Sequence, residues 1–311
     1  MRVNYSLAPI RPDQYQLACD IMTTQECAHN PDFGSISIDE MQMFFTSRGT
    51  LTGHTLMLTL EGDRDPVAVV SVTEDPVRAK FWTASAWLPH LNLAGIVVDE
   101  TMRLAKSLHP DWKFQPNVSL EDSAYIDAYT SRGFQEIQRT YSMRIIFDQP
   151  VLKPELPIGF AIREVASEKD WQDFHKIHAD AFEGHFGFVH RTLEDFVSFR
   201  TDSATFDPKG IFILSNNHGE DIAFVECTDD IAEMNMAFIN TVGVIHREHK
   251  KGYGKLVMQQ AFAYASHQGR DGVELYVDIA NKSGALAFYE GLGMRPISAI
   301  ACLENPAWAS V

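Results

Sequence analysis

The sequence has few cysteines and no long hydrophobic run, and both absences restrict the kind of protein it encodes. Its four cysteines, Cys19, Cys27, Cys227 and Cys302, are scattered over 311 residues without a Cys-x-x-Cys pair. This argues against a disulfide framework and a cysteine zinc site, and it suits a reducing compartment. No window approaches the apolar length that crosses a bilayer, and the first residues hold no apolar stretch of signal-peptide length. We therefore expect a cytoplasmic protein without a membrane partner.

Positive charge is also scarce. The chain has 26 Lys and Arg against 42 Asp and Glu, a formal net charge of −16. Most of such a surface repels nucleic acid, so we expect no nucleic-acid partner. Against this background residues 246–255, HREHKKGYGK, contain four Lys or Arg and one Glu. This local excess of positive charge is compatible with a small anionic ligand.

The basic segment follows a predicted strand, INTVGVIH (239–246), and precedes a helix that begins near Gly254. The first N–H groups of a helix lack partners within the helix, and the helix dipole favours negative charge there. Gly252 and Gly254 let the backbone approach a ligand closely. The alternative is an ordinary solvated turn. Three lysines add Coulomb attraction for an anion: Lys250, Lys251 and Lys255.

Two common phosphate-binding loops do not fit this segment. A Walker A loop requires Gly and Ser or Thr at the positions that His249 and Leu256 occupy. A dinucleotide-binding fingerprint requires three glycines after the first strand of its domain, and only two glycines occur here, late in the chain. A nucleotide triphosphatase and a dinucleotide-binding enzyme are therefore not expected.

The chain reads as two similar halves. Three prolines in DQPVLKPELPIGF (148–160) predict an extended linker. We expect a first domain over 1–148, a linker over 149–158 and a second domain over 159–311; one large domain is the alternative. Residues 123–137 match 283–297 at a constant offset. The matching pairs are Ser123 and Ser283, Tyr129 and Tyr289, Gly133 and Gly293, and Ile137 and Ile297.

The hydrophobic periodicity of the second half predicts a mixed α/β fold, and the first half follows a similar order. The expected order is β-α-α-β-β-β-α-β-α-β. The expected segments are 160–165, 168–182, 192–199, 210–215, 222–227, 236–245, 254–269, 273–278, 283–293 and 295–303.

The second half resembles the GNAT superfamily of acetyl-coenzyme A-dependent N-acyltransferases. In that family a strand ending in V-x-x-x-x-[RQ]-x-x-G-x-[GA] leads into a helix, and here the stretch runs from Val244 to Gly254 with His249 at the Arg or Gln position. The downstream signature, an Asn, an apolar-Tyr pair and Gly-Phe, reads as Asn281, Phe288-Tyr289 and Gly293-Met294. The resemblance implies two GNAT folds in tandem, as in mycothiol synthase and its relatives, with the coenzyme in the C-terminal half.

The resemblance also implies a set of coenzyme-binding residues on the strand, the loop and the helix start. In the first half HLNLAG (90–95) stands where HKKGYG (249–254) stands, so one glycine and both lysines are missing. We therefore expect the N-terminal copy to be degenerate and to bind no coenzyme through that loop. The residues expected to bind acetyl-CoA are Val242, Gly243, Val244, His249, Lys250, Lys251, Gly252, Tyr253, Gly254, Lys255 and Asn281.

Acyl transfer to an amine requires a base for the amine and an acid for the departing thiolate. The resemblance implies that Tyr289 is the acid, although a core tyrosine is the alternative, because Tyr129 occurs in the half without the loop. We predict Glu226 as the base, with Glu233, His185 and His190 as alternatives. His175 and His178 lie one helical turn apart, but nothing completes a familiar metal spacing, so no metal is expected.

The leading hypothesis is an acyltransferase that moves an acetyl group from coenzyme A to a small-molecule amine. A homodimer is compatible with the sequence. One rival is a coenzyme-binding or regulatory module without turnover, which the substitution of His249 for Arg or Gln keeps open. Another is a structural dimerisation protein, which would bind no coenzyme.

Overall fold

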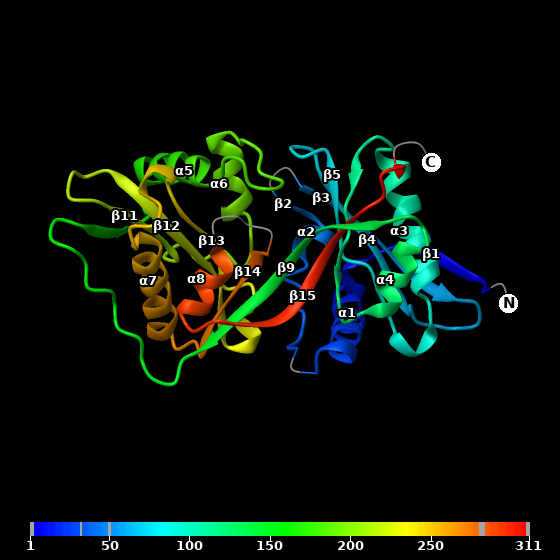
Figure 1. Cartoon of the computed structure of the whole chain (residues 1–311). Helices are drawn as coiled ribbons and strands as arrows, with labels where there is room; N and C mark the ends of the chain where they lie inside the picture. The colour runs from blue at the N-terminus through cyan, green and yellow to red at the C-terminus, as the bar shows by residue number, and fades with distance from the viewer. Residues whose placement is uncertain (1–2, 32, 49–50, 280–283, 309–311) are drawn as a thin grey trace. The chain divides into compact units, whose positions relative to one another are not determined.

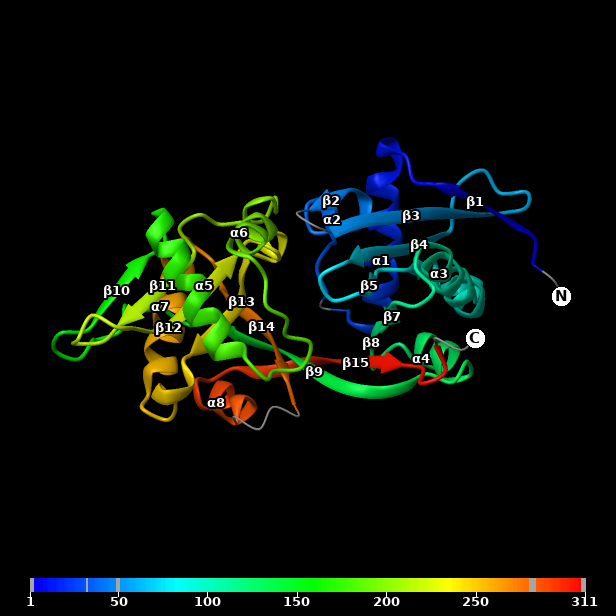
Figure 2. The same ribbon diagram turned by 90° about the horizontal axis from the view of Figure 1, so that it is seen from above.

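The structure is a computed structural model that describes residues 3–31, 33–48, 51–279 and 284–308. The chain divides into two compact units, whose elements are labelled in Figures 1 and 2. Unit 1 consists of residues 1–140 and 298–311, and unit 2 consists of residues 141–297. Each unit contains a mixed sheet with helices packed against it. This confirms the predicted fold class.

Unit 1 is built on strands in the order β1-β3-β4-β5-β7, in which β5 and β7 are parallel and the other neighbours antiparallel. Short strand β6 pairs with β4 just beyond β5. Its elements are β1 (Tyr5–Pro9), α1 (Tyr15–His29), α2 (Gln42–Phe45), β2 (Ser47–Arg48), β3 (Leu51–Leu60), β4 (Ala68–Asp75), β5 (Lys80–Thr83), β6 (Ala86–Trp87), α3 (Ala94–Leu108), β7 (Lys113–Phe114), β8 (Asn117–Ser119) and α4 (Ser123–Thr130).

Unit 2 contains strands in the order β10-β11-β12-β13-β14, antiparallel except for the parallel pair β13 and β14. The order of helices and strands is the predicted one. Its elements are β10 (Ala161–Glu164), α5 (Glu168–Phe182), α6 (Leu193–Thr201), β11 (Ile211–Ser215), β12 (Asp221–Thr228), β13 (Met236–Val244), α7 (Tyr253–His267), β14 (Gly272–Asp278) and α8 (Ala285–Gly291).

The two remaining strands, β9 (Gln135–Ile146) and β15 (Arg295–Glu304), do not stay with the half of the chain that precedes them. The end of β9 lies in unit 2, where Arg144 donates a 2.9 Å hydrogen bond to Glu274 of β14. Most of β15 lies in unit 1, where Ile300 pairs with Ser119 of β8. The observed division therefore differs from the expected boundaries at 148 and 159. Each half of the chain supplies a strand to the other unit, which local sequence patterns do not reveal.

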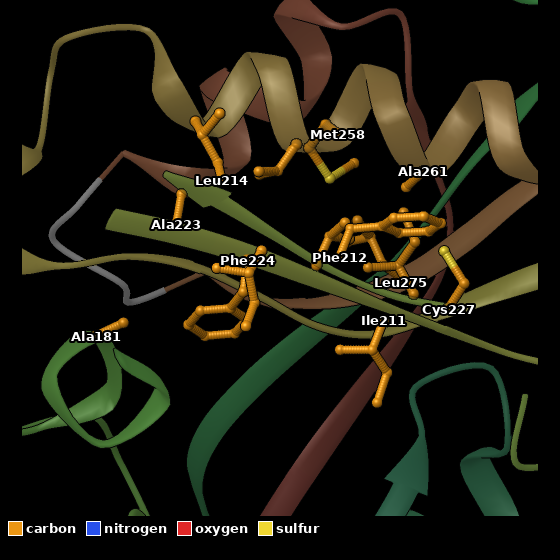
Figure 3. Close-up of a cluster of buried hydrophobic side chains, with 14 of the residues drawn as sticks. Ala181, Ile211, Phe212, Leu214, Ala223, Phe224, Cys227, Met258, Ala261 and Leu275 are labelled. Atoms are coloured by element: carbon orange, nitrogen blue, oxygen red, sulfur yellow. The ribbon is translucent and has the colours of Figure 1, made fainter. Parts of the chain in front are cut away.

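The sheet of unit 2 is covered on both faces, as Figure 3 shows: α7 lies over one face with Met258 and Ala261, and α5 lies under the other with Ala181. Phe224 of β12 points towards Ala181. A Cβ atom built on Gly243 would lie 2.6 Å from the ring of Phe224 and 2.9 Å from the Ala181 Cβ. Glycine at position 243 is therefore required for helix α5 to pack this closely on β13.

The proline-rich stretch carries no helix or strand between residues 151 and 160. It follows the surface of unit 2, where the backbone N–H of Val151 donates a 3.0 Å hydrogen bond to the Ser266 hydroxyl of α7. Leu156 packs against the core of the same unit. The prolines explain the extended conformation, and the contacts explain why this stretch is an ordered part of unit 2.

Candidate active site

The site begins where two parallel strands stop pairing. Strand β13 pairs with β14 only from Met236 to Phe238, opposite Gly272 to Glu274, although β13 continues to Val244. On its other side β13 stays paired with β12 through Val244. The register on that side shifts between Glu226 and Cys227, which makes Asn240 the extra residue of a β-bulge. One edge of β13, residues 239–244, therefore lies beyond the pairing with β14.

Backbone donors on this edge point away from β12. The N–H of Ile245 donates a 3.0 Å hydrogen bond to the carbonyl of Ile222, in register with the antiparallel pairing of β12 and β13. In such a pair, successive residues direct their backbone groups to opposite sides. The N–H groups of Val242 and Val244 therefore face the side on which β14 no longer pairs. Consistently, the carbonyl of Val244 accepts a 2.8 Å hydrogen bond from Nε2 of His249.

The chain then forms a tight loop into α7. After one turn of 3-10 helix over His246–Glu248, Lys250 and Gly252 both adopt positive φ, of 63° and 88°. Nothing lies within 4 Å of a Cβ atom built on Gly252, so the backbone conformation, and not lack of space, favours glycine there. Gly254, in contrast, packs closely, since an added Cβ would lie 3.3 Å from the ring of Phe288.

The start of α7 differs from those of α5 and α6, and like the start of α8 it follows a glycine of positive φ without a side-chain cap. The Ser167 hydroxyl accepts a hydrogen bond from the Asp170 N–H at the start of α5, and Thr192 accepts one from Asp195 at the start of α6. Helix α7 follows Gly252 and has no side-chain cap. Lys250, Lys251 and Lys255 are exposed around it, and Lys251 forms a 2.9 Å ion pair with Glu248. Uncapped N–H groups within a basic surface favour a nearby anion.

Tyr289 lies on α8, beside Phe288, which contacts Gly254 at the start of α7. Its side chain is 8% exposed and belongs to the core of unit 2. Burial raises the pKa of the Tyr289 phenol above its usual value, because the apolar surroundings disfavour the phenolate. Tyr289 is therefore protonated throughout the neutral range and able to donate a proton.

Glu226 lies on the α5 and α6 side of the sheet in a buried ion pair. Nε of Arg200, on α6, is 3.1 Å from both of its carboxylate oxygens, and the amide of Asn240 donates a 3.1 Å hydrogen bond to Oε2. The guanidinium carbon of Arg200 lies 3.8 Å from the ring centroid of Phe196. Burial lowers the pKa of Arg200, and Glu226 opposes that shift. Oε1 of Glu226 accepts no hydrogen bond from the residues that the structure describes.

These features match a known family. The model of the acetyltransferase (GNAT) family matches residues 171–294, which include most of α5, all of α6 to α8 and the whole loop. The match lies within unit 2 and covers less than half of the chain.

Curated relatives carry related names. The chain is 31% identical over 165 residues to a mycothiol acetyltransferase of Thermobispora bispora, covering 52% of this chain and 55% of the relative. It is 28% identical over 140 residues to an uncharacterized N-acetyltransferase of Methanocaldococcus jannaschii, covering 44% of this chain and 61% of the relative. The matched part thus spans little more than half the length of these relatives.

Two solved structures extend the likeness to both units. A GCN5-related N-acetyltransferase from Sphaerobacter thermophilus matches with a TM-score of 0.78 at 18% identity, covering 96% of this chain and 94% of that one. A tandem GNAT protein from the clavulanic acid biosynthesis pathway matches with a TM-score of 0.75 at 13% identity, covering 96% and 98%. The chain therefore consists of two GNAT folds in tandem, as predicted.

The structure brings most of the predicted GNAT coenzyme residues together. Val242 to Val244 and His249 to Lys255 follow one edge of β13 into the start of α7. Asn281 lies outside the described residues. Neither the role of Arg200 nor the bulge at Asn240 was predicted, because a single charged residue in a helix and one extra residue in a strand leave no periodic signal.

Other features lie away from the GNAT loop. A cavity of about 480 Å³ is lined by residues of α1 and by Ser35 to Asp39 of unit 1. A second, of about 270 Å³, is lined in unit 2 by residues that include Lys153, Phe212 and Gln260. Within the described ranges, no three or more His, Cys, Asp and Glu residues are grouped so that they could hold a metal ion. None of the helices described is long and apolar enough to span a membrane.

Proposed function

We propose that unit 2 transfers an acetyl group from acetyl-CoA to the amine of a small molecule. The observation that carries the proposal is the divergence of β13 from β14 after Phe238 and Glu274, immediately before an uncapped helix start. Because the two strands diverge there, the N–H donors of β13 lead directly into a basic loop that favours an anion. A molecule with amide groups next to a diphosphate matches this sequence of donors, and coenzyme A has that chemistry.

The residues fit the coenzyme in two segments. The N–H group of Val244, next to the loop, hydrogen-bonds the amide arm, and that of Val242, further from the loop, hydrogen-bonds the thioester carbonyl, in the manner of an added strand. The N–H groups of the loop from His249 to Gly254 bind the diphosphate, and the exposed lysines add attraction. His249 donates to the Val244 carbonyl, so in this chain its side chain fixes the strand end and leaves the diphosphate to backbone donors.

Acetyl-CoA supplies an activated thioester, and the chain supplies the proton transfers. The amine nitrogen forms a bond to the acetyl carbon while the carbon–sulfur bond breaks and its electron pair moves to sulfur. Tyr289 donates its phenolic proton to that sulfur; its raised pKa keeps the phenol protonated at neutral pH, although it also makes the phenol a weaker acid. Glu226 receives the proton of the amine through Oε1, which is buried 3.1 Å from Nε of Arg200 and accepts no hydrogen bond from the described residues, so the acceptor must displace the side chains that cover it.

With Glu226 as the base and Tyr289 as the acid, the acceptor amine and the coenzyme approach from opposite faces of the sheet. Glu226 lies on the side of α5 and α6, with Arg200. Tyr289 lies on α8, which contacts the start of α7 through Phe288 and Gly254. The acceptor therefore approaches from the α5 and α6 side, and the coenzyme from the side of α7 and α8. The net charge of −16 favours a cationic amine as acceptor.

Calorimetry with acetyl-CoA, followed by a free-thiol assay over a panel of small amines, tests this function. We expect binding together with amine-dependent thiol release. Binding without thiol release for any amine would favour a regulatory coenzyme-binding module, and absence of binding would refute the proposal. Because curated relatives are named mycothiol acetyltransferase, amines related to mycothiol are included in the panel.

A further inference from the structure

The strands of unit 1 pair in the same order and direction as those of unit 2, so the two units can be compared residue by residue. Parallel pairing of β5 with β7 ends at Phe81 and Phe114. The N–H of Leu88 donates a 3.0 Å hydrogen bond back to the carbonyl of Val67, just as Ile245 does to Ile222 in unit 2. The residue before Leu88 is Trp87, which therefore occupies the position of Val244.

The backbone groups at this position of unit 1 already have partners. The N–H of Trp87 donates a 2.7 Å hydrogen bond to Oε1 of Gln25, a residue of α1 that is 4% exposed. Nε2 of Gln25 donates a 2.7 Å bond to Asp122, whose carboxylate also caps α4. The Tyr125 hydroxyl donates a 3.0 Å bond to the carbonyl of Ser85, and its ring packs edge-on against Trp87 at 5.0 Å.

In unit 2 both of these side chains are replaced by alanine. Helix α1 buries Ala18, Ile21 and Gln25, and α5 buries Phe174, Ile177 and Ala181 with the same spacing, so Ala181 corresponds to Gln25. The repeat that aligns Tyr129 with Tyr289 aligns Tyr125 with Ala285. An alanine side chain has no polar atom that could bond to the backbone and occupies much less volume. The same backbone position is thus filled in unit 1 by side chains that unit 2 lacks.

We propose that Gln25 and Tyr125 occupy the coenzyme position of unit 1, so that the chain binds a single acyl-coenzyme A, in unit 2. The Gln25 carboxamide takes the hydrogen bond to Trp87 that the coenzyme amide takes to Val244. Displacement would break the bond from Gln25 to Asp122 and leave the Gln25 carboxamide without these partners, and a buried polar group without a partner is unfavourable. The identity of the ligand rests on the function proposed for unit 2.

Calorimetric titration of the full chain with acetyl-CoA tests the stoichiometry. We expect the wild type to bind one molecule of acetyl-CoA per chain. Gly252→Val should bind none, because the positive φ of residue 252 disfavours any β-branched side chain. Gly269→Val is the matched control. Gly269 lies just after the other end of α7, with a φ of 77° and nothing within 4 Å of an added Cβ atom. This variant should bind acetyl-CoA as the wild type does. Two molecules per chain, or one retained by Gly252→Val, would overturn the inference. No binding by the wild type would refute the function of unit 2 and agree with a filled unit 1.

Amide hydrogen exchange tests the contact itself. Acetyl-CoA should slow exchange at Val244 and leave the already slow Trp87 amide unchanged. Gln25→Ala should accelerate exchange at Trp87 by roughly tenfold, the equivalent of one hydrogen bond. Gln16→Ala, an exposed glutamine of the same helix, should not. Slower exchange at Trp87 on addition of acetyl-CoA, or no effect of Gln25→Ala, would show that Gln25 does not hold this position.

Discussion

Replacing Tyr289 by phenylalanine removes one hydroxyl group and tests the proposed acid directly. The side chain is 8% exposed, and burial alone perturbs its hydroxyl, with no hydrogen bond from the described residues. The fold therefore loses no bond, and we expect the free energy of unfolding to change by less than about 1 kcal/mol. Loss of a general acid typically lowers turnover by about 100- to 10,000-fold. Affinity for acetyl-CoA should stay within about threefold of the wild type, because backbone donors carry the binding.

The assay combines thiol release at saturating acetyl-CoA with calorimetry for affinity. Tyr129→Phe is the matched control, because Tyr129 holds the equivalent position of unit 1 and is also buried; its turnover should equal that of the wild type. Tyr289 acts in its protonated form, and burial raises its pKa above the usual value of about 10. The wild-type rate should therefore show no alkaline loss from this group below about pH 10. A Tyr289→Phe enzyme with at least half of the wild-type turnover would refute the acid role.

Three further changes test other parts of the site and the fold. Glu226→Gln keeps the shape of the side chain and should lower turnover by about 100-fold without changing coenzyme affinity; an unchanged rate would place the base elsewhere. His249→Ala removes the bond to Val244 and should weaken acetyl-CoA binding by about three- to tenfold in calorimetry, and unaltered affinity would contradict that role. Deleting residues 298–311 removes most of β15 and should speed amide exchange in β8; exchange at the wild-type rate would show that the strand is dispensable.

The order of elements was predictable because each segment has its own period. Helix α7 carries a buried stripe that includes Val257, Met258 and Ala261, and the strands of unit 2 are short apolar runs. The loop was predictable for a related reason, since two glycines and three lysines gather in an otherwise acidic chain. Both signals are local in the sequence, and the structure places both as expected.

The strand exchange was not predictable, because it is a matter of partner choice and not of local conformation. SMRIIF at the end of β9 and RPISAIACL in β15 have the composition of strands in either unit. Nothing within them specifies that Arg144 meets Glu274 or that Ile300 meets Ser119. The surroundings of Glu226 escaped prediction for the same reason. Its partners Arg200 and Asn240 come from a helix and a different strand, and only the packed sheet brings them together.

The repeat in the sequence and the proposed difference in coenzyme binding between the two units depend on different residues. Tyr129 and Tyr289 match, and so do Gly133 and Gly293, but these residues serve the core and the turn after the last helix, which any copy of the fold needs. The two copies diverge at Gln25 against Ala181, where both side chains are buried and helical periodicity is preserved. Hydrophobic patterning cannot register that difference, because it records burial and not whether a buried side chain carries hydrogen-bonding groups. To recognise a degenerate copy of this fold, the loss of the loop glycines is therefore not sufficient. A better criterion is whether side chains already bind the backbone N–H groups of the diverging strand.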